Sequence, residues 1–273
     1  MIATEMRNPK TMHIDRATTR EMLELINEEN YNSVRAVEAA IPMIERAVEA
    51  VTRAVSTGHR LIYIGAGTSG RLAVVDASEC PPTYGVSYDV VSAIMAGGYE
   101  AIVRPSENVE DNGEAGVRAL MEKKLVAEDV VMGISASGNA EFVSRALEYA
   151  RSVGCTTVSL ASNPDCAIGR IADIPIFTDT GAEVITGSTR MKAGNAQKMV
   201  LNMISTASMI KSGKVYENMM INLRPTNKKL RERMIGITME ITGLDHGAAE
   251  ALLEENEFSI PRAAEAHRSA EGE

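Results

Sequence analysis

Two short runs of glycine and hydroxyl residues carry the clearest chemical signal in this chain. The run G-A-G-T-S-G at residues 65–70 follows an apolar stretch at 61–64, and S-A-S-G at residues 135–138 follows another at 130–134. Small residues let a backbone close around a ligand, and a helix that starts after such a loop presents free N–H groups and the positive end of its dipole. Hydroxyl side chains add directional donors. The sequence therefore predicts a site for a phosphorylated metabolite, with these substrate-binding residues: Thr68, Ser69, Ser135, Ser137 and Gly138.

The spacing Gly65-x-Gly67-x-x-Gly70 also matches the fingerprint of a dinucleotide-binding fold. Such a fold needs an acidic residue about 20 positions further on, at the end of its second strand, to hold the ribose hydroxyls. Here the next apolar stretch runs from Val90 to Met95 into A-G-G, with no carboxylate at its tip. A nicotinamide site is therefore disfavoured. A strand-to-helix turn without any ligand is a further alternative, which the pair of hydroxyl-rich loops disfavours.

Two groups of carboxylates lie downstream of the first loop. Glu79 precedes Pro81 and Pro82, which we expect to end a helix, to hold Cys80 extended and to fix Glu79 on stiff backbone. A carboxylate held in this way beside a sugar phosphate can act as a general acid or base, but it can equally be a helix-end glutamate in solvent. The second group, at residues 106–111, precedes an expected helix, where acidic residues commonly cap and complement the dipole.

Composition excludes several classes of protein. The formal net charge of −9 over 273 residues and a pI near 5.2 argue against nucleic acid or an anionic membrane as the partner. The four histidines are scattered, so no metal site is expected, and the three cysteines have no C-x-x-C spacing, which favours a reducing compartment. No apolar run is typical of a signal peptide or a membrane span. We expect a soluble, cytoplasmic protein.

The elements that must position these residues alternate between strands and helices. Apolar strands without polar alternation are typical of a parallel sheet that helices cover on both faces, an α/β fold. The expected strands are residues 61–64, 90–95, 130–134, 156–161 and 174–178, and the expected helices are residues 69–78, 113–123, 139–153 and 188–211.

Helical patterns flank this region on both sides. We expect one helix over residues 16–30 and a second from Ser33 to Ser56, with Ser33 as its N-cap and a kink or break at Pro42. Its apolar seam predicts packing on the core or on a partner subunit. Beyond residue 211 we expect three short helices and a disordered end from Arg268. The predicted segments are 1–57, an N-terminal helical part, 58–211, the sheet domain, and 212–273, a small helical bundle.

Four long motifs carry a resemblance to a known family. They read G-A-G-T-S-G-R-L, D-A-S-E-C-P-P-T-Y-G, G-I-S-A-S-G and G-A-E-V-I-T-G-S-T-R-M-K-A-G-N-A-Q-K-M-V-L-N-M. Together they closely resemble the N-acetylmuramic acid 6-phosphate etherases, a family within the sugar isomerase (SIS) domain superfamily, from about Thr4 to Gly243. The resemblance implies a three-layer α/β/α sandwich with a flavodoxin-like parallel sheet, a small C-terminal helical bundle, a homodimer, and no metal or cofactor.

The same resemblance implies a lyase in cell-wall amino sugar recycling. Its substrate is a small sugar phosphate, N-acetylmuramic acid 6-phosphate, from which elimination and hydration give N-acetylglucosamine 6-phosphate and D-lactate. Glu79 matches the family's glutamate in S-E-C-P-P and is assigned as the acid for departing lactate. Glu110, in E-N-V-E-D, matches a second glutamate and is assigned as the base at carbon 2. The chain departs from the family at Ser135, Pro105 and Asn108.

Two other functions remain open on the same fold. A sugar-phosphate isomerase also needs a base at carbon 2, but isomerases lack the S-E-C-P-P acid. A non-catalytic sugar-phosphate sensor, similar to the glucokinase regulatory protein, uses the same scaffold, although that protein carries two such domains in one chain. Fold by itself does not decide between a catalyst and a sensor.

Overall fold

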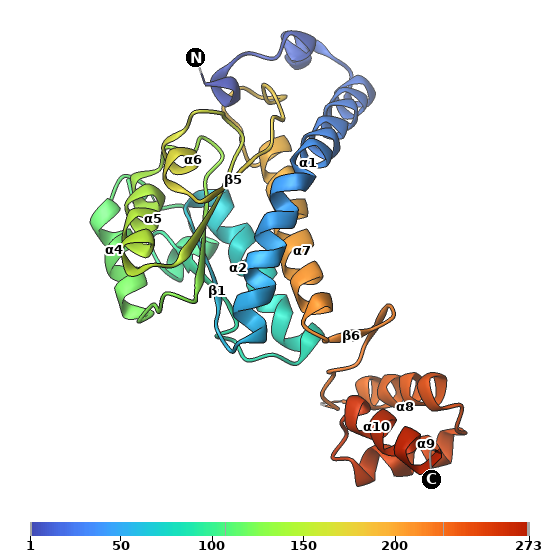
Figure 1. Cartoon of the computed structure of the whole chain (residues 1–273). Helices are drawn as coiled ribbons and strands as arrows, with labels where there is room; N and C mark the ends of the chain where they lie inside the picture. Colours follow the sequence, from blue (N-terminus) through green and yellow to red (C-terminus); the bar gives the residue numbers. More distant parts are fainter. Residues whose placement is uncertain (1, 107, 226, 272–273) are drawn as a thin grey trace. The chain divides into compact units, whose positions relative to one another are not determined.

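The chain forms two compact units, shown in Figure 1. A computed structural model describes residues 2–106, 108–225 and 227–271. The first unit, here the sheet unit, comprises Met1–Ala77 and Asp89–Ser208, and the second, here the helical unit, comprises Ser78–Tyr88 and Met209–Glu273. The predicted segments 1–57 and 58–211 thus fall mainly in the sheet unit and 212–273 falls in the helical unit. Residues 78–88, expected in the middle segment, belong to the helical unit.

Five parallel strands form the sheet, in the order β2-β1-β3-β4-β5. Their bounds are β1 Leu61–Gly65, β2 Val91–Met95, β3 Val130–Ile134, β4 Thr156–Ala161 and β5 Ile174–Phe177. This is the flavodoxin-like strand order, which confirms the expected fold. Every residue of β1 and β3 is buried, as expected for central strands covered on both faces.

Helices cover the two faces of the sheet (Figure 1). The helices of this unit are α1 Thr19–Ser56, α2 Gly67–Tyr84, α3 Glu100–Val103, α4 Gly113–Glu122, α5 Glu141–Val153, α6 Ala167–Ile171 and α7 Lys192–Lys211, of which α2 and α7 continue into the helical unit. On one face Ile62 and Ile64 pack in a core with Phe142 and Leu147 of α5. On the other, Tyr63 donates a hydrogen bond of 2.9 Å to Asp76 of α2. Because neighbouring strand residues face opposite ways, the unit has three layers.

One continuous helix, α1, replaces the two helices expected before the sheet. Thr18 caps it in a capping box with Glu21, so it begins at Thr19 and passes Asn30 and Ser33 without a break. Ser33 is buried and donates a hydrogen bond of 3.0 Å to the carbonyl of Lys192, a tertiary contact rather than an N-cap. Pro42 lies inside the helix, where it costs one backbone hydrogen bond that the buried flanking positions outweigh.

The helix α2 also runs further than expected. It includes Pro81 and Pro82 and ends at Tyr84, so Glu79 and Cys80 are helical rather than at a helix end or extended. A proline φ near −65° fits a helix, and two adjacent prolines remove only two N–H donors close to its end. The carbonyl of Pro81 still accepts a hydrogen bond of 2.9 Å from Gly85. The expectation that the proline pair stops this helix was wrong.

Three 3-10 turns precede α1 and a small bundle forms the helical unit. The turns are η1 Ala3–Glu5, η2 Pro9–Thr11 and η3 Ile14–Arg16. The bundle contains a hairpin that the sequence did not predict and the three expected helices: β6 Val215–Tyr216, β7 Met219–Met220, α8 Lys228–Thr242, α9 His246–Glu255 and α10 Ile260–Glu271. Residues 268–271, expected to be disordered, continue α10, and 272–273 lie outside the described residues.

Among the described helices, none has both the length and the apolar character of a membrane span.

Candidate active site

The two glycine- and hydroxyl-rich loops meet at one edge of the sheet. Strands β1 and β3 are neighbours in parallel register, with Gly65 opposite Ile134, so the loops that follow them lie side by side. This is the point at which the strand order reverses, where open α/β sheets bind ligands. A cavity of about 210 Å³ opens there, with these lining residues: Glu5, Ala66, Gly67, Thr68, Ser69, Glu110, Ile134, Ser135, Ala136, Ser137, Ala140 and Thr189. The fold therefore brings Thr68, Ser69, Ser135, Ser137 and Glu110 together.

Close packing explains the glycines of the first loop. A Cβ on Gly70 would lie 2.6 Å from the carbonyl oxygen of Gly65 and 2.3 Å from the sulfur of Met95. Gly67, with φ of +55°, adopts the left-handed conformation at the start of α2. The three glycines thus let strand, turn and helix approach each other, so the fingerprint spacing needs no dinucleotide to account for it. The first turn of α2 presents its N–H groups at this loop.

The second loop is held by hydrogen bonds to its own hydroxyls. Ser135 Oγ accepts from the N–H of Gly138 at 3.0 Å, and Ser137 Oγ accepts from the N–H of Asn139 at 3.3 Å. A hydroxyl that accepts from the backbone keeps its own proton for a further acceptor, such as a phosphate oxygen. Gly138 is not a lining residue: its φ is +76°, and a Cβ there would lie 2.4 Å from Cys166 Sγ. Gly138 shapes the loop, and its assignment to substrate binding stays a prediction.

A buried amide stands behind the first loop. Gln197 of α7 is 1% exposed, and its Oε1 accepts a hydrogen bond of 3.0 Å from the Ser69 hydroxyl. Within the described part of the chain, its Nε2 has no partner. With the amide turned end for end, Nε2 donates to Ser69 Oγ and the Ser69 proton is free for a ligand in the cavity. The orientation of the Gln197 amide therefore decides whether the Ser69 hydroxyl can donate a hydrogen bond to a ligand in the cavity.

Glu110 reaches the cavity from the segment before α4. Its backbone carbonyl accepts a hydrogen bond of 2.9 Å from the N–H of Phe142, which ties it to the start of α5. Its carboxylate makes no hydrogen bond or ion pair with any other described residue and is available to a ligand. Asn108 has φ of +60°, a conformation that asparagine tolerates better than most residues, so this departure from the family fits the turn. The cap of α4 is Asn112.

Glu79 is not brought to this cavity. It is exposed on the part of α2 that belongs to the helical unit, and it is not a lining residue. A helix that follows a parallel strand runs back along the sheet, away from the strand's carboxyl end. Ten helical residues separate Glu79 from Ser69, a rise of about 15 Å along α2. Its assignment as a catalytic acid stays a prediction.

Two lining residues with polar or charged side chains, Glu5 and Thr189, were not predicted from the sequence. Thr189 belongs to the family motif G-S-T-R, so a signal for it was present. Glu5 belongs to η1, before the first helix expected from the sequence, and no local pattern pointed to it. It reaches the cavity only because the N-terminal segment folds onto the second loop.

The nearby cations serve structural roles. Arg71 donates to the carbonyls of Ile102 and Ala101, at 2.9 and 2.8 Å, which holds α3 in place. Lys192 is buried in an ion pair with Glu29, with 2.5 Å between Nζ and Oε2. The groups that the cavity offers to an anion are therefore neutral hydroxyls and backbone N–H donors.

A buried charge network supports the loop that carries Thr189. Burial favours the neutral form of Glu29, but hydrogen bonds from Lys192, Lys10 and Asn8 outweigh it and lower its pKa to about 2. Glu183 accepts the first N–H groups of α7, at 3.0 Å from Lys192 and 2.9 Å from Ala193. Burial nevertheless raises the pKa of Glu183. The network joins α1 to the start of α7 and so fixes the segment between Glu183 and Lys192.

Asp76 fixes the position of α2 through buried hydrogen bonds to β1 and α7. It is 5% exposed and accepts hydrogen bonds from Tyr63 of β1 and from Asn202 and Ser205 of α7. Burial raises its pKa, and these donors oppose the shift. Three elements thereby meet at one carboxyl, which sets α2, and with it Thr68 and Ser69, against α7.

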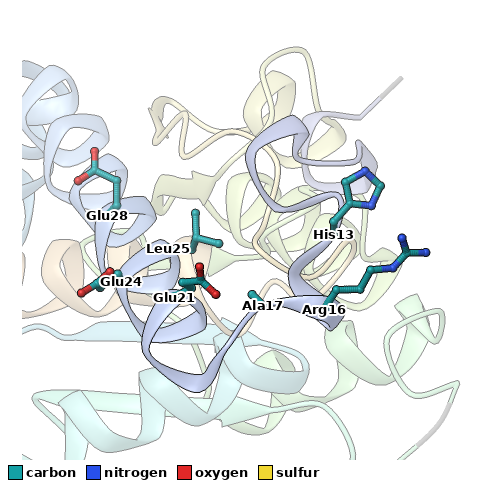
Figure 2. Close-up of a pocket in the computed structure, with 7 residues that line it drawn as sticks. All are labelled: His13, Arg16, Ala17, Glu21, Glu24, Leu25 and Glu28. Carbon is teal, nitrogen blue, oxygen red and sulfur yellow. The ribbon is translucent and has the colours of Figure 1, made fainter.

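A wider hollow near the start of α1 is less suited to a phosphate. Figure 2 shows its lining residues, which come from residues 13–17 and from α1. Its volume is about 720 Å³. Three of its seven lining residues are glutamates of α1: Glu21, Glu24 and Glu28. Glu21 is engaged in the helix cap and Glu24 pairs with Arg20 at 2.9 Å. An acidic hollow repels an anion, and none of the predicted site residues lies there.

Within the described residues, no group of three or more His, Cys, Asp or Glu is placed to hold a metal ion.

Comparison with known proteins gives the family. The model of the glucokinase regulatory protein N-terminal SIS domain matches residues 43–151. The N-acetylmuramic acid 6-phosphate etherase of Oceanobacillus iheyensis is 50% identical over 262 residues, covering 96% of this chain and 89% of that protein. That of Actinobacillus pleuropneumoniae serotype 7 is 51% identical over 250 residues, covering 92% and 82%. This chain belongs to the N-acetylmuramic acid 6-phosphate etherase family.

Solved structures agree with the sugar isomerase fold of this family. A phosphoheptose isomerase from Francisella tularensis superposes with a TM-score of 0.53 at 18% identity, over 72% of this chain and 100% of that one. The Vibrio vulnificus NanR protein, complexed with ManNAc-6P, gives a TM-score of 0.51 at 15% identity, over 70% and 64%. At these identities the likeness is one of fold alone, and it confirms the α/β architecture.

Proposed function

We propose that this protein is a carbon–oxygen lyase that cleaves the D-lactyl ether of N-acetylmuramic acid 6-phosphate, in cell-wall amino sugar recycling. The sugar opens to its aldehyde, which acidifies the proton on carbon 2. A base removes that proton, the ether bond at carbon 3 breaks as its oxygen is protonated, and D-lactate departs. Water then adds to the double bond and gives N-acetylglucosamine 6-phosphate. Membership of the etherase family is the observation that carries this proposal.

The geometry of the cavity supports the proposal. Hydroxyls of Thr68, Ser135 and Ser137 line the cavity, and the first N–H groups of α2 follow one of its loops, a combination that suits the phosphate. The carboxylate of Glu110, which has no partner among the described residues, lines the same cavity, where it can accept a proton from carbon 2. A phosphate clamp and a proton acceptor within one small cavity are two of the parts that the elimination step requires, and a proton donor is the third.

The proton donor in this proposal is Glu79, supplied by a second copy of the chain. Within one chain Glu79 is not a lining residue of the cavity, and its side chain is exposed. Val75, four residues before Glu79 in α2, is 54% exposed and offers an apolar side chain to a partner surface. In a homodimer that covers this side of α2, Glu79 of one subunit would reach the substrate in the cavity of the other and protonate its ether oxygen.

An apolar stripe on α1 supports the homodimer. Leu23, Val34 and Ile41 are 62%, 55% and 49% exposed. They are separated by eleven and seven residues, about three and two helical turns, so they lie on one side of the helix. In the predicted apolar seam of α1, Val37, Ile44, Val48 and Val51 are buried, while Val34 and Ile41 are exposed and suit a partner subunit. The three cysteines form no disulfide with one another, which supports the cytoplasm as the compartment.

Incubation with N-acetylmuramic acid 6-phosphate tests the proposal directly. We expect release of D-lactate together with N-acetylglucosamine 6-phosphate, measured by coupled oxidation of the lactate and by mass spectrometry of the sugar. The match to the regulatory SIS domain favours one competing function, a sugar-phosphate sensor. Tight binding of the sugar phosphate with no lactate release would favour that sensor and refute the lyase.

A further inference from the structure

The carboxylate of Glu5 is an unexplained part of the proposed active site. It lines the same cavity as Glu110 and the two hydroxyl-rich loops, although it comes from the first helical turn of the chain. It makes no hydrogen bond or ion pair with any other residue in the described ranges. A Cβ on Gly187 would lie 3.3 Å from Glu5 Oε2, so the carboxylate rests beside a residue that has no side chain.

Buried polar contacts hold the segment that carries Glu5. The neighbouring Thr4 is 1% exposed; its N–H donates to Asn163 Oδ1 at 3.4 Å, and its hydroxyl accepts from Asn163 Nδ2 at 3.3 Å. The same amide donates to the carbonyls of Ala136 and Ser137, at 3.1 and 3.3 Å. Asn163 therefore fastens the N-terminal segment to the second phosphate-binding loop.

Two further anchors continue this N-terminal strap, defined here as residues 2–12. Asn8 donates to Glu29 at 2.8 Å and to the carbonyl of Ala182 at 3.2 Å. Thr11 donates to the carbonyl of Val184 at 2.8 Å. A buried polar side chain is costly unless it is hydrogen-bonded, so three such anchors within eight residues set one backbone path. They place the exposed carboxylate of Glu5 in the cavity without any contact of its own.

We propose that Glu5 binds the sugar part of the substrate as a hydrogen-bond acceptor. This inference rests on the proposed function. A carboxylate repels a phosphate, so Glu5 cannot serve the anion-binding side of the cavity. An ionised carboxylate only accepts hydrogen bonds, and uncharged donors of an amino sugar, a hydroxyl or the acetamido N–H, satisfy it. Glu5 thereby orients the sugar relative to Glu110, and Thr4 and Asn163 act as positioning residues.

Binding of two ligands to Glu5→Gln tests this role. We expect the dissociation constant for N-acetylglucosamine 6-phosphate to rise about 10-fold, because a charge-assisted hydrogen bond becomes a neutral one. Binding of inorganic phosphate should stay equal or become tighter, because a like charge is removed. The matched control is Asp15→Asn, an exposed carboxylate of η3 outside the cavity, which should change neither constant. Equal weakening of both ligands in E5Q would overturn the proposal.

The kinetics of the same variants separate this inference from the proposed function. If wild-type protein releases no lactate, the lyase assignment fails, while the two binding constants still test Glu5. If wild-type protein releases lactate and E5Q matches it in both affinity and kcat/KM, the role of Glu5 alone is refuted. Thr4→Val keeps the carboxylate but loses the anchoring hydroxyl, and it should weaken sugar phosphate binding in the same direction. Wild-type affinity in T4V would overturn the positioning role of Thr4.

Discussion

Individual side chains around the cavity divide into those that the fold uses and those that it leaves available. Ser135 and Ser137 accept backbone N–H groups, and Ser69 bonds to Gln197, so these hydroxyls are oriented before any ligand arrives. The carboxylates of Glu5 and Glu110 have no such engagement within the described part of the chain. Preorganised donors and free acceptors on one cavity are the arrangement expected of a site that binds a phosphate at one end and moves a proton at the other.

Substitution of Glu110 by glutamine tests the residue proposed as the base. A glutamine keeps the size of the side chain but cannot take a proton, so turnover should fall roughly 10²- to 10⁴-fold, the usual contribution of a positioned acid or base. The fall should appear in kcat of D-lactate release, with an unchanged melting temperature. Glu122→Gln, an exposed glutamate at the end of α4, is the control and should keep wild-type turnover. Near-normal kcat in E110Q would remove Glu110 from the mechanism.

Among the elements, several loops contain glycines with a left-handed backbone, a conformation that disfavours other residues. Gly138 combines a left-handed backbone with a Cβ position only 2.4 Å from Cβ and Sγ of Cys166. Gly58 has a similar φ of +84°, but nothing lies within 4 Å of its Cβ position. Gly58 therefore needs glycine only for its left-handed backbone, whereas Gly138 needs it also because a side chain would overlap with Cys166.

Alanine at these two positions should have unequal effects. Gly58→Ala should cost about 1 kcal/mol, the price of a left-handed alanine alone. Gly138→Ala should add the overlap with Cys166, for a total of about 2–4 kcal/mol, and should also weaken phosphate binding because Ser135 and Ser137 move. Chemical denaturation and phosphate titration measure the two effects. Equal losses of unfolding free energy in both variants would show that the Cys166 side chain moves away from the added methyl group at no measurable cost.

The buried pair between α1 and α7 predicts a pH dependence of stability. The pKa of Glu29 is about 2 in the folded chain, below its ordinary 4.5, so the folded state binds fewer protons. Its contribution is then complete above pH 4.5 and is lost as the pH falls towards 2. In Glu29→Gln, which leaves Lys192 buried without a counter-charge, unfolding free energy should drop by about 3–5 kcal/mol at pH 7.

Denaturation of wild type and Glu29→Gln across the acid range checks this sign. The difference between their free energies of unfolding should be constant near neutrality and should shrink from about pH 4.5 downward. Glu24→Gln is the matched control, since Glu24 lies on the same helix in an exposed pair with Arg20 and should cost less than about 1 kcal/mol. A difference that is independent of pH would mean that Glu29 contributes through packing alone.

At the scale of the whole molecule, the proposed mechanism needs two chains. The cavity with Glu110 lies in the sheet unit, while Glu79 belongs to the helical unit and is not among the residues that line the cavity. Exposed apolar residues on α1 and α2 give a second copy a surface to cover. A shared site of this kind makes activity depend on association, not only on the fold of one chain.

Mixing two inactive variants tests whether the site is shared. In a dimer of Glu79→Gln with Glu110→Gln, one of the two sites keeps both carboxylates, provided that each site takes its acid from the partner. Random pairing of equal amounts should therefore restore roughly a quarter of the wild-type lactate release. A mixture of Glu79→Gln with the doubly substituted chain is the control and should stay inactive. No recovery in the first mixture would mean that both carboxylates act within one chain.

Local sequence determined much of this protein. Apolar runs predicted the five strands of the parallel sheet to within a residue or two, and glycine with hydroxyl residues marked both loops, because strand burial and tight turns depend on near neighbours. Tertiary structure alone decided the rest. Ser33 became a helix-interior contact to Lys192, the proline pair stayed within α2, and Glu5 reached the cavity through Asn163, 158 positions further along the chain. These outcomes depend on contacts between residues far apart, whose energies outweigh local preference and leave no periodic pattern to detect.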